Sequence, residues 1–410
     1  MINDGVVPPI ALEAARPFSV TELLDAALAR RGSARGDVGA FCAPGPGTGD
    51  DFLEPFELLL ESLEADAHLT VLGRWITHRF LDRLLDVRLQ IAAYAREDPA
   101  VREERIIEPI VVVGAPRTGT TALHALLAAD HRHRVPLGWE LLRPVPPPVA
   151  GEEDGRVALA DLELRLPQTV SGGLESIHAY SGRMHKECLS AMSFTFRSEE
   201  FVSRYSTTRY IDWLRTCDMT PAYEMHRLVL QILQRRQPTQ RWVLKSPVHL
   251  HNLDPLLAIY PDARLVVTHR DPLAILGSVT SLIARLRAAH SDEVSIPEIA
   301  RYHADLYLSD LDGLRRRVDR GLPADVAVAH ASFDELRADP IGVVHRIYDG
   351  LGLQVPADVR AALIRVSEER ASETHAVHAW SFESLGLDPQ EQRDLFAAYC
   401  AKFAVTEEVR

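Results

Sequence analysis

Residues 109 to 121 read PIVVVGAPRTGTT and carry, in order, the patterns of a buried strand, a loop and a helix. The β-branched run Ile110 to Val113 is typical of a parallel strand that is covered on both faces. Leucines recur at offsets of three and four after it, which predicts a helix from Thr120 to about Asp130. Free backbone N–H groups at the start of that helix would face an anion. The stretch therefore predicts a phosphate-binding loop.

The loop differs from the common nucleotide-binding signature at one position. Gly114, Gly119, Thr120 and Thr121 nearly satisfy G-x-x-x-x-G-K-[ST], but Thr120 occupies the lysine position. Arg117 supplies a positive charge inside the loop instead. Because the missing lysine normally meets a magnesium-bridged γ-phosphate, we expect a phosphate-like anion that is presented differently. A glycine turn that binds nothing is the alternative, and the combination of strand, arginine, threonines and helix disfavours it.

Composition limits the class of protein. The chain has 410 residues, 46% of them hydrophobic, which is enough for one large core with accessory helices. Its net charge of −13 disfavours an extended nucleic-acid surface and confines any polyanion site to a local group of cations. Four scattered cysteines without a C-x-x-C pair disfavour a zinc site and a disulfide framework. The sequence has neither a leader-like start nor a membrane-span pattern, so we expect a cytoplasmic protein.

Three further buried-strand patterns follow the loop, at Arg241 to Ser246, Ala263 to Arg270 and Asp325 to Ser332. Helical periodicity lies between them. We therefore predict an α/β fold, with a P-loop-type parallel β-sheet flanked by helices. Ligands of such sheets bind beyond the carboxyl ends of the strands, which is where the charged motifs fall.

The chain divides into two regions in this interpretation. Residues 1–105 form a helical N-terminal region packed on the core, in which Ser19 and Glu22 fit a capping box at the start of a helix. Residues 106–410 form the α/β core. A helical insertion at about 140–240 belongs to that core, and we expect it to be a lid over the substrate.

Two groups of polar residues should meet at the loop. Lys245 ends its strand and should project at the same sheet edge as Arg117. Arg270 and Ser278 flank a turn at which Pro272 suits the first turn of a helix. An arginine fork and a hydroxyl could clamp a second phosphate there. The alternatives are a solvated strand end for Lys245 and an ion pair between Arg270 and a neighbouring carboxylate.

In this order, the motifs resemble those of bacterial sulfotransferases that use 3′-phosphoadenosine-5′-phosphosulfate (PAPS). The resemblance covers nearly the whole length. GAPRTGTT is similar to the 5′-phosphosulfate loop, RWVLKSPVHL to the strand-borne lysine motif, and HRDPLAILGSV to the 3′-phosphate motif, whose arginine and serine lie eight residues apart. Three further segments are less similar to the family but follow its order along the chain: GWELLRP, SFDELRADP and HAWSFESLGL.

The resemblance implies a sulfotransferase that moves a sulfuryl group from PAPS to a hydroxyl, less readily an amine, of a small-molecule, lipid or glycan acceptor. The product would be 3′,5′-adenosine diphosphate (PAP), and no metal would be required. By this resemblance Arg117 and Lys245 are catalytic, and His378 approaches the cofactor. The cofactor-binding residues are then Pro116, Arg117, Thr118, Gly119, Thr120, Thr121, Arg270 and Ser278.

The general base is the open assignment. In the animal-type cytosolic branch of the family a histidine two residues after the strand lysine is the base, and here Pro247 stands in its place. Other branches place a glutamate after the loop helix. Glu140 matches that position, and we assign the base to it. His185, Glu187 and His249 are the rival candidates.

Two other functions fit parts of the pattern. A P-loop nucleotide kinase-like phosphotransferase shares the fold, but the missing lysine and the lack of a strand-terminal aspartate for magnesium count against it. A catalytically inactive nucleotide-binding scaffold is the second, and the presence of both Arg117 and Lys245 disfavours it. We expect no nucleic-acid partner, and the sequence is compatible with a homodimer. Aromatic residues between 194 and 213 point to an apolar or ring-bearing acceptor, although their spacing is also typical of a core.

Overall fold

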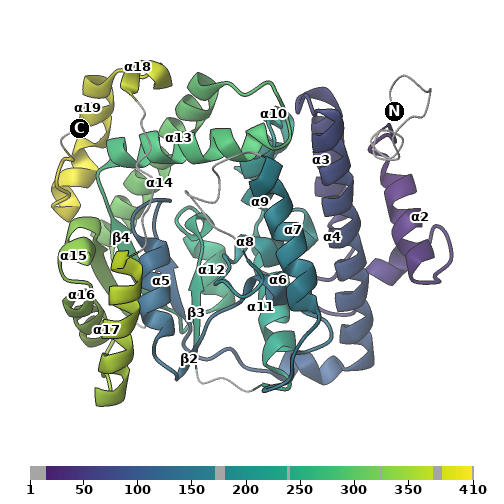
Figure 1. Ribbon diagram of the computed structural model, residues 1–410, viewed down its shortest axis with the longest axis horizontal. Helices are drawn as coiled ribbons and strands as arrows, with labels where there is room; N and C mark the ends of the chain where they lie inside the picture. The colour runs from purple at the N-terminus through teal and green to yellow at the C-terminus, as the bar shows by residue number, and fades with distance from the viewer. Residues whose placement is uncertain (1–14, 171–180, 238–240, 323–325, 373–380, 409–410) are drawn as a thin grey trace.

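The computed structural model describes residues 15–170, 181–237, 241–322, 326–372 and 381–408 (Figure 1). Its centre is a five-stranded sheet with the strand order β2-β3-β1-β4-β5. Each neighbouring pair of strands is parallel. The chain is therefore an α/β protein, as predicted. The strands are β1 (Ile110–Val113), β2 (His133–Arg134), β3 (Arg241–Lys245), β4 (Arg264–His269) and β5 (Val328–Ser332).

Apolar side chains cover both faces of the sheet. Along β1, Ile110 and Val112 pack into one hydrophobic cluster, and Val111 and Val113 pack into another. The alternation follows from the pleat, which sends successive side chains to opposite faces. Leucines of α5 and the apolar side chains of α16 cover the first face, and helices such as α11 and α13 cover the second. The uninterrupted β-branched run in β1 reflects this double burial.

Most of the remaining chain is helical. In Figure 1 the N-terminal helices α2, α3 and α4 lie together at one end of the molecule, and α15, α16, α17 and α19 lie at the other. The helices before β3 are α2 (Val20–Arg30), α3 (Leu53–Ala65), α4 (Val71–Glu97), α5 (Thr120–Ala128), α6 (Gly138–Leu142), α7 (Arg156–Val170), α8 (Leu189–Met192), α9 (Glu199–Arg204), α10 (Thr208–Leu214) and α11 (Thr220–Gln234). Those after β3 are α12 (Leu253–Ile259), α13 (Pro272–Ala288), α14 (Ile296–Arg320), α15 (Phe333–Ala338), α16 (Pro340–Gly350), α17 (Ala357–Ser372), α18 (Phe382–Leu385) and α19 (Pro389–Phe403). Short 3₁₀ turns cover Val38–Phe41, Pro99–Glu103, Ser193–Thr195 and Pro247–His249.

The predicted elements around the loop are confirmed. The four predicted strands are present, and each of the last three is shorter than its predicted range by one or more residues. The start of the fourth, Asp325, lies outside the described residues. Ser19 caps α2 by accepting a hydrogen bond from the Glu22 backbone N–H at 3.4 Å. Strand β2 was not predicted, because two residues are too few to show a period.

Two whole-chain features bear on the expectations from composition. All four cysteines are free thiols. Among the described residues, none of the helices combines the length and the apolar character that a membrane crossing requires.

A close approach of backbones joins α4 to the end of α13. A Cβ atom at Gly73 would lie 1.9 Å from the carbonyl oxygen of His290. We expect Gly73→Ala to lower the free energy of unfolding by about 1 to 3 kcal/mol, because α4 would have to move away from this backbone. Gly313 of α14 is the matched control, since a Cβ there meets nothing within 4 Å.

Gly313→Ala should leave the stability unchanged or raise it by up to about 1 kcal/mol. Urea denaturation of both variants measures the difference. Equal unfolding free energies for the two variants would contradict the contact.

Candidate active site

The loop after β1 lies tightly against β4. Gly119 has φ +87° and precedes the first residue of α5. A Cβ atom at Gly114 would lie 2.0 Å from the Thr268 hydroxyl oxygen, so only glycine fits at this position. The Thr118 hydroxyl is 2.6 Å from the same Thr268 oxygen and donates to the Ala115 carbonyl at 2.8 Å. These contacts fix the loop above the sheet, with the N-terminus of α5 open toward it.

Lys245 occupies the carboxyl end of β3, next to β1. Its ammonium group is largely buried and lies 2.5 Å from Oε1 of Glu187. It also donates to the Thr121 hydroxyl in the first turn of α5 at 3.3 Å. The backbone N–H of Cys188 donates to the Lys245 carbonyl at 3.1 Å, which holds the Glu187 segment against the strand end. Lys245 therefore connects the start of α5 with a carboxylate.

The two arginines lie in a second group beside the loop. Arg117 has φ 70°, and its Nε donates to the Ser278 hydroxyl at 2.9 Å. Arg270 donates from Nη1 to the Arg117 carbonyl at 2.6 Å, and its guanidinium lies over the Phe333 ring at 3.9 Å. Burial and the neighbouring Arg270 charge lower the pKa of Arg117. Ser278 and both guanidinium groups thus meet at one end of the site.

The expected ion-pair alternative for Arg270 occurs, with an acid that lies far away in the sequence. Arg270 donates from Nε and Nη2 to the two carboxylate oxygens of Glu408, at 2.5 and 2.9 Å. Asp271 instead pairs with Arg393 of α19 at 2.8 Å. Neither Glu408 nor Arg393 shows a local sequence signal for this position. Phe333 lies in the SFDELRADP stretch, to which the resemblance gives no role.

The predicted residues therefore come to one sheet edge in two groups. Lys245 joins Thr121, and Arg117 joins Ser278 and Arg270. His378 lies outside the described residues.

Glu140 has structural contacts that its sequence position did not reveal. Its Oε1 accepts from Arg134 Nη2 at 2.6 Å, and its Oε2 accepts from the Leu137 backbone N–H at 2.9 Å. Both carboxylate oxygens are thus used at the start of α6, and the residue is only 3% exposed. Glu140 as the general base stays an untested hypothesis, which these contacts do not favour.

The three rival candidates for the general base differ in their exposure to solvent. His249 is fully buried, and its Nδ1 lies 2.8 Å from the Tyr223 hydroxyl. Burial holds the pKa of His249 well below its ordinary value. His185 is exposed and pairs with Leu137 through an isolated β-bridge. Glu187 is partly exposed and is the rival that contacts Lys245.

The aromatic residues noted in the insertion are mostly core. Phe196 packs on Phe56 with ring centroids 4.4 Å apart and on Phe201 at 5.9 Å. Phe194, Phe196, Phe201, Tyr205 and Tyr210 are each at most 1% exposed. They contribute to folding, and the hint of an aromatic acceptor that rested on them is withdrawn.

Comparison with known proteins fits this geometry. A family model described as the sulfotransferase family matches residues 109–357. The crystal structure of sulfotransferase STF1 from Mycobacterium tuberculosis H37Rv superposes with a TM-score of 0.77 at 28% identity, covering 92% of this chain and 98% of that one. Sulfotransferase STF9 from Mycobacterium avium gives a TM-score of 0.83 at 25% identity, covering 97% and 99%. The chain belongs to the sulfotransferase family.

Curated relatives match over a shorter length. Omega-hydroxy-beta-dihydromenaquinone-9 sulfotransferase Stf3, from Mycobacterium bovis and Mycobacterium tuberculosis, is 27% identical over 267 residues. The match covers 60% of this chain and 63% of those relatives.

The contacts of Glu140 predict a loss of stability when it is changed. In Glu140→Gln the guanidinium of Arg134, whose side chain is 13% exposed, would lose its charged partner. We expect the free energy of unfolding to fall by about 2 to 4 kcal/mol. The control is Glu61→Gln, which breaks an exposed pair with Arg209 and should cost less than about 1 kcal/mol. Urea titration of both variants tests this, and equal midpoints would contradict the structural role.

Proposed function

We propose that this protein transfers a sulfuryl group from PAPS to a hydroxyl group of its acceptor. The observation that carries the proposal is the meeting of three cationic side chains beside a phosphate-binding loop that lacks the usual lysine. Lys245 comes from the end of β3, Arg117 from the loop after β1, and Arg270 from the end of β4. Family membership favours this function over a P-loop phosphotransferase or an inactive scaffold.

The residues present fit a nucleotide with two separate anionic groups. Lys245 and the free N–H groups at the start of α5 suit the 5′-phosphosulfate, with Pro116, Thr118, Gly119, Thr120 and Thr121 as the surrounding loop. Arg270 and Ser278 suit the 3′-phosphate, since an arginine fork can bind two phosphate oxygens. Gly114 and Gly119 shape this loop by packing, since a Cβ atom would lie 2.0 Å from Thr268 at the first and 2.8 Å from Leu336 at the second.

The position of Arg117 changes the ligand group to which we assign its charge. The family resemblance places it at the sulfuryl oxygens, but its guanidinium lies against Ser278. We therefore assign its charge to the 3′-phosphate side of the site. A direct part in sulfuryl transfer stays a prediction.

The chain would contribute electrostatics and a base to the reaction. PAPS, when bound, supplies the sulfuryl group and the phosphate that departs from it. Lys245 and the N–H groups of α5 would stabilise negative charge at this end of the site. Removing one such donor commonly costs on the order of 10²- to 10³-fold in rate.

We assign the general base to Glu187 in place of Glu140. Its carboxylate is the acidic group that touches Lys245, and its side chain is 24% exposed, so an acceptor hydroxyl can reach it. Glu187 would take the proton of the acceptor as the sulfuryl group arrives.

The acceptor is assigned as a class of molecule, not as one compound. By its name, Stf3 acts on an omega-hydroxy-dihydromenaquinone, which is a hydroxyl on a lipid-like molecule. We propose a small or lipid-like alcohol for this chain, with the insertion at 140–240 covering it. A cytoplasmic location and a homodimer stay predictions.

Nucleotide binding provides the first test. PAP and adenosine 5′-monophosphate differ by the 3′-phosphate alone, so PAP should raise the thermal midpoint more than the monophosphate or ATP does. Arg270→Ala should remove the advantage of PAP, because the arginine fork is lost. Differential scanning fluorimetry measures these shifts. Equal shifts with all three nucleotides in the unaltered protein would refute the assignment of PAPS.

Single-turnover rates test the base. Glu187→Gln should lower the rate by ~10²-fold or more and remove its fall at acidic pH, because the amide cannot accept the proton. Glu140→Gln is the matched comparison, and its folded fraction should keep both the rate and the acidic limb. If Glu140→Gln loses that limb while Glu187→Gln keeps it, the base is Glu140 and our assignment is wrong.

A further inference from the structure

The guanidinium proposed to bind the 3′-phosphate is occupied by a carboxylate of the same chain. Arg270 Nε and Nη2 point at the two oxygens of Glu408, at 2.5 and 2.9 Å. The side chains are 9% and 20% exposed, so the pair is largely withdrawn from water. Two parallel N–H donors on two oxygens are also the arrangement by which arginine binds a phosphate group. Glu408 and a 3′-phosphate would therefore need the same face of Arg270.

Arg270 has other contacts that do not depend on Glu408. Its ring contact with Phe333 and its hydrogen bond to the Arg117 carbonyl involve different parts of the guanidinium. These contacts keep the fork aimed at the same place when the carboxylate leaves. Glu408 is thus the exchangeable partner of Arg270.

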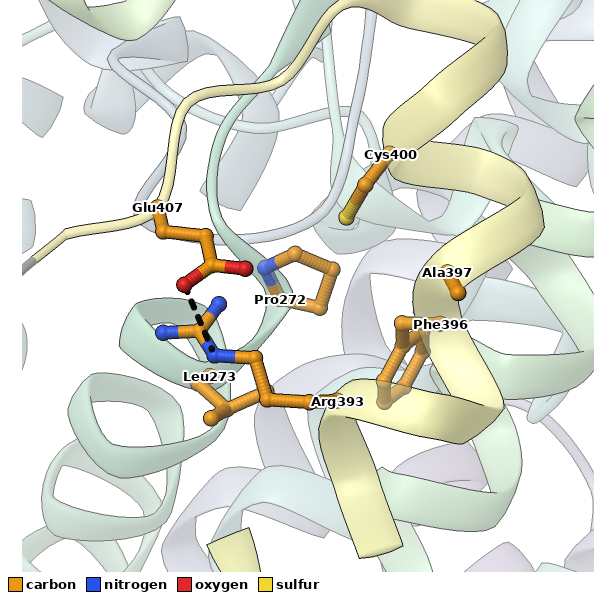
Figure 2. A pocket seen from close by; sticks show the side chains of 7 residues that line it. All are labelled: Pro272, Leu273, Arg393, Phe396, Ala397, Cys400 and Glu407. Carbon is orange, nitrogen blue, oxygen red and sulfur yellow. Dashed lines mark ion pairs between the residues drawn. The ribbon is translucent and has the colours of Figure 1, made fainter. Parts of the chain in front are cut away.

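In the segment Val405–Glu408, which follows α19, Val405 packs against the hydrophobic core, and Glu407 and Glu408 are held by polar contacts. The Glu408 backbone N–H donates to Asp271 Oδ2 at 2.8 Å, and Arg393 lies 3.7 Å from the Glu407 carboxylate. Figure 2 shows Glu407 facing Arg393, with Ala397 and Cys400 of α19 on the opposite side of the pocket. This cavity has a volume of about 190 Å³, so the segment is not closely packed on α19 at this point.

Polar anchoring beside a cavity keeps the free-energy cost of displacing Glu407 and Glu408 small. Glu407 is 70% exposed on its side chain, and most of the segment has substantial solvent access. Little apolar area would therefore be exposed if Glu407 and Glu408 moved away while Val405 stayed on the core. A dianionic phosphate also carries more charge than one carboxylate and can compete for the same fork.

We propose that Glu408 is an internal competitor of the 3′-phosphate group. This inference rests on the proposed function. Glu408 occupies Arg270 in the nucleotide-free protein and leaves when a 3′-phosphorylated nucleotide binds. The apparent affinity for the nucleotide is then lowered by the fraction of molecules in which the segment is undocked. Return of Glu408 to Arg270 as the 3′-phosphate departs also favours release of the product PAP.

Calorimetric titration with PAP and with adenosine 5′-monophosphate tests the competitor. Glu408→Gln should lower the Kd for PAP by about tenfold, the change expected if the segment is docked about nine-tenths of the time. The Kd for the monophosphate should stay unchanged, because that nucleotide has no group for Arg270. Glu57→Gln of α3 is the control for net charge: it removes one negative charge from an exposed side chain outside the segment and should leave both constants unchanged.

The outcomes separate this proposal from the one it rests on. Unchanged or weaker PAP binding in Glu408→Gln, with a native preference for PAP over the monophosphate, overturns the competitor alone. An equal gain in Glu57→Gln, or an equal gain for both nucleotides, also overturns it, because the effect would then be one of net charge. If the native protein shows no preference for PAP, the proposed function fails, and this inference fails with it. Urea midpoints of the two variants confirm that each is folded during titration.

Discussion

The site exists because β1 is hydrogen-bonded to a parallel strand on each side. In the register, Val112 lies opposite Lys245 of β3, and Val113 lies opposite Val267 of β4. The three strands therefore end at the same edge: β3 and β1 end within one residue of each other, and β4 continues two residues further. A lysine that ends β3, a loop that leaves β1 and an arginine that follows β4 have to meet there. Both faces of β1 are buried, and its alternate side chains pack into two different hydrophobic clusters.

A second constraint sets how close the loop sits to the sheet. Gly114 leaves no space for a Cβ atom next to the Thr268 hydroxyl, and Thr118 hydrogen-bonds to that same hydroxyl. The threonine of β4 therefore holds the loop that leaves β1. Because Arg270 follows Thr268 by two residues, the contact that fixes the loop also fixes the distance from the loop to the arginine. The position of the α5 N-terminus and that of Arg270 are coupled through one side chain.

The sequence was informative where structure depends on a local pattern. The β-branched run predicted β1, buried-strand patterns predicted β3, β4 and β5, and the loop spacing predicted the start of α5. Strand β2 has only two residues and no period to detect. The partners of Glu140 could not be read from the sequence, because Leu137 at the start of α6 carries none of the side-chain oxygens that mark a capping box. The pair of Arg270 and Glu408 spans 138 residues, and no local signal connects such positions.

Carboxylates that lie outside the sequence motifs neutralise cations that the motifs contain. A guanidinium or an ammonium group removed from water is costly unless it has a charged partner. Lys245 is paired with Glu187, and Arg270 with Glu408, while Asp271 is held by Arg393. Two of the three cations at the site, Lys245 and Arg270, are thus paired with carboxylates, whereas Arg117 contacts the Ser278 hydroxyl. In our proposal, nucleotide binding would exchange one anion for another at Arg270, whereas the carboxylate at Lys245 would stay and act on the acceptor. The two ion pairs would then have different roles. Glu408 would be replaced at Arg270 by the 3′-phosphate, whereas Glu187 would be retained beside Lys245 as the base.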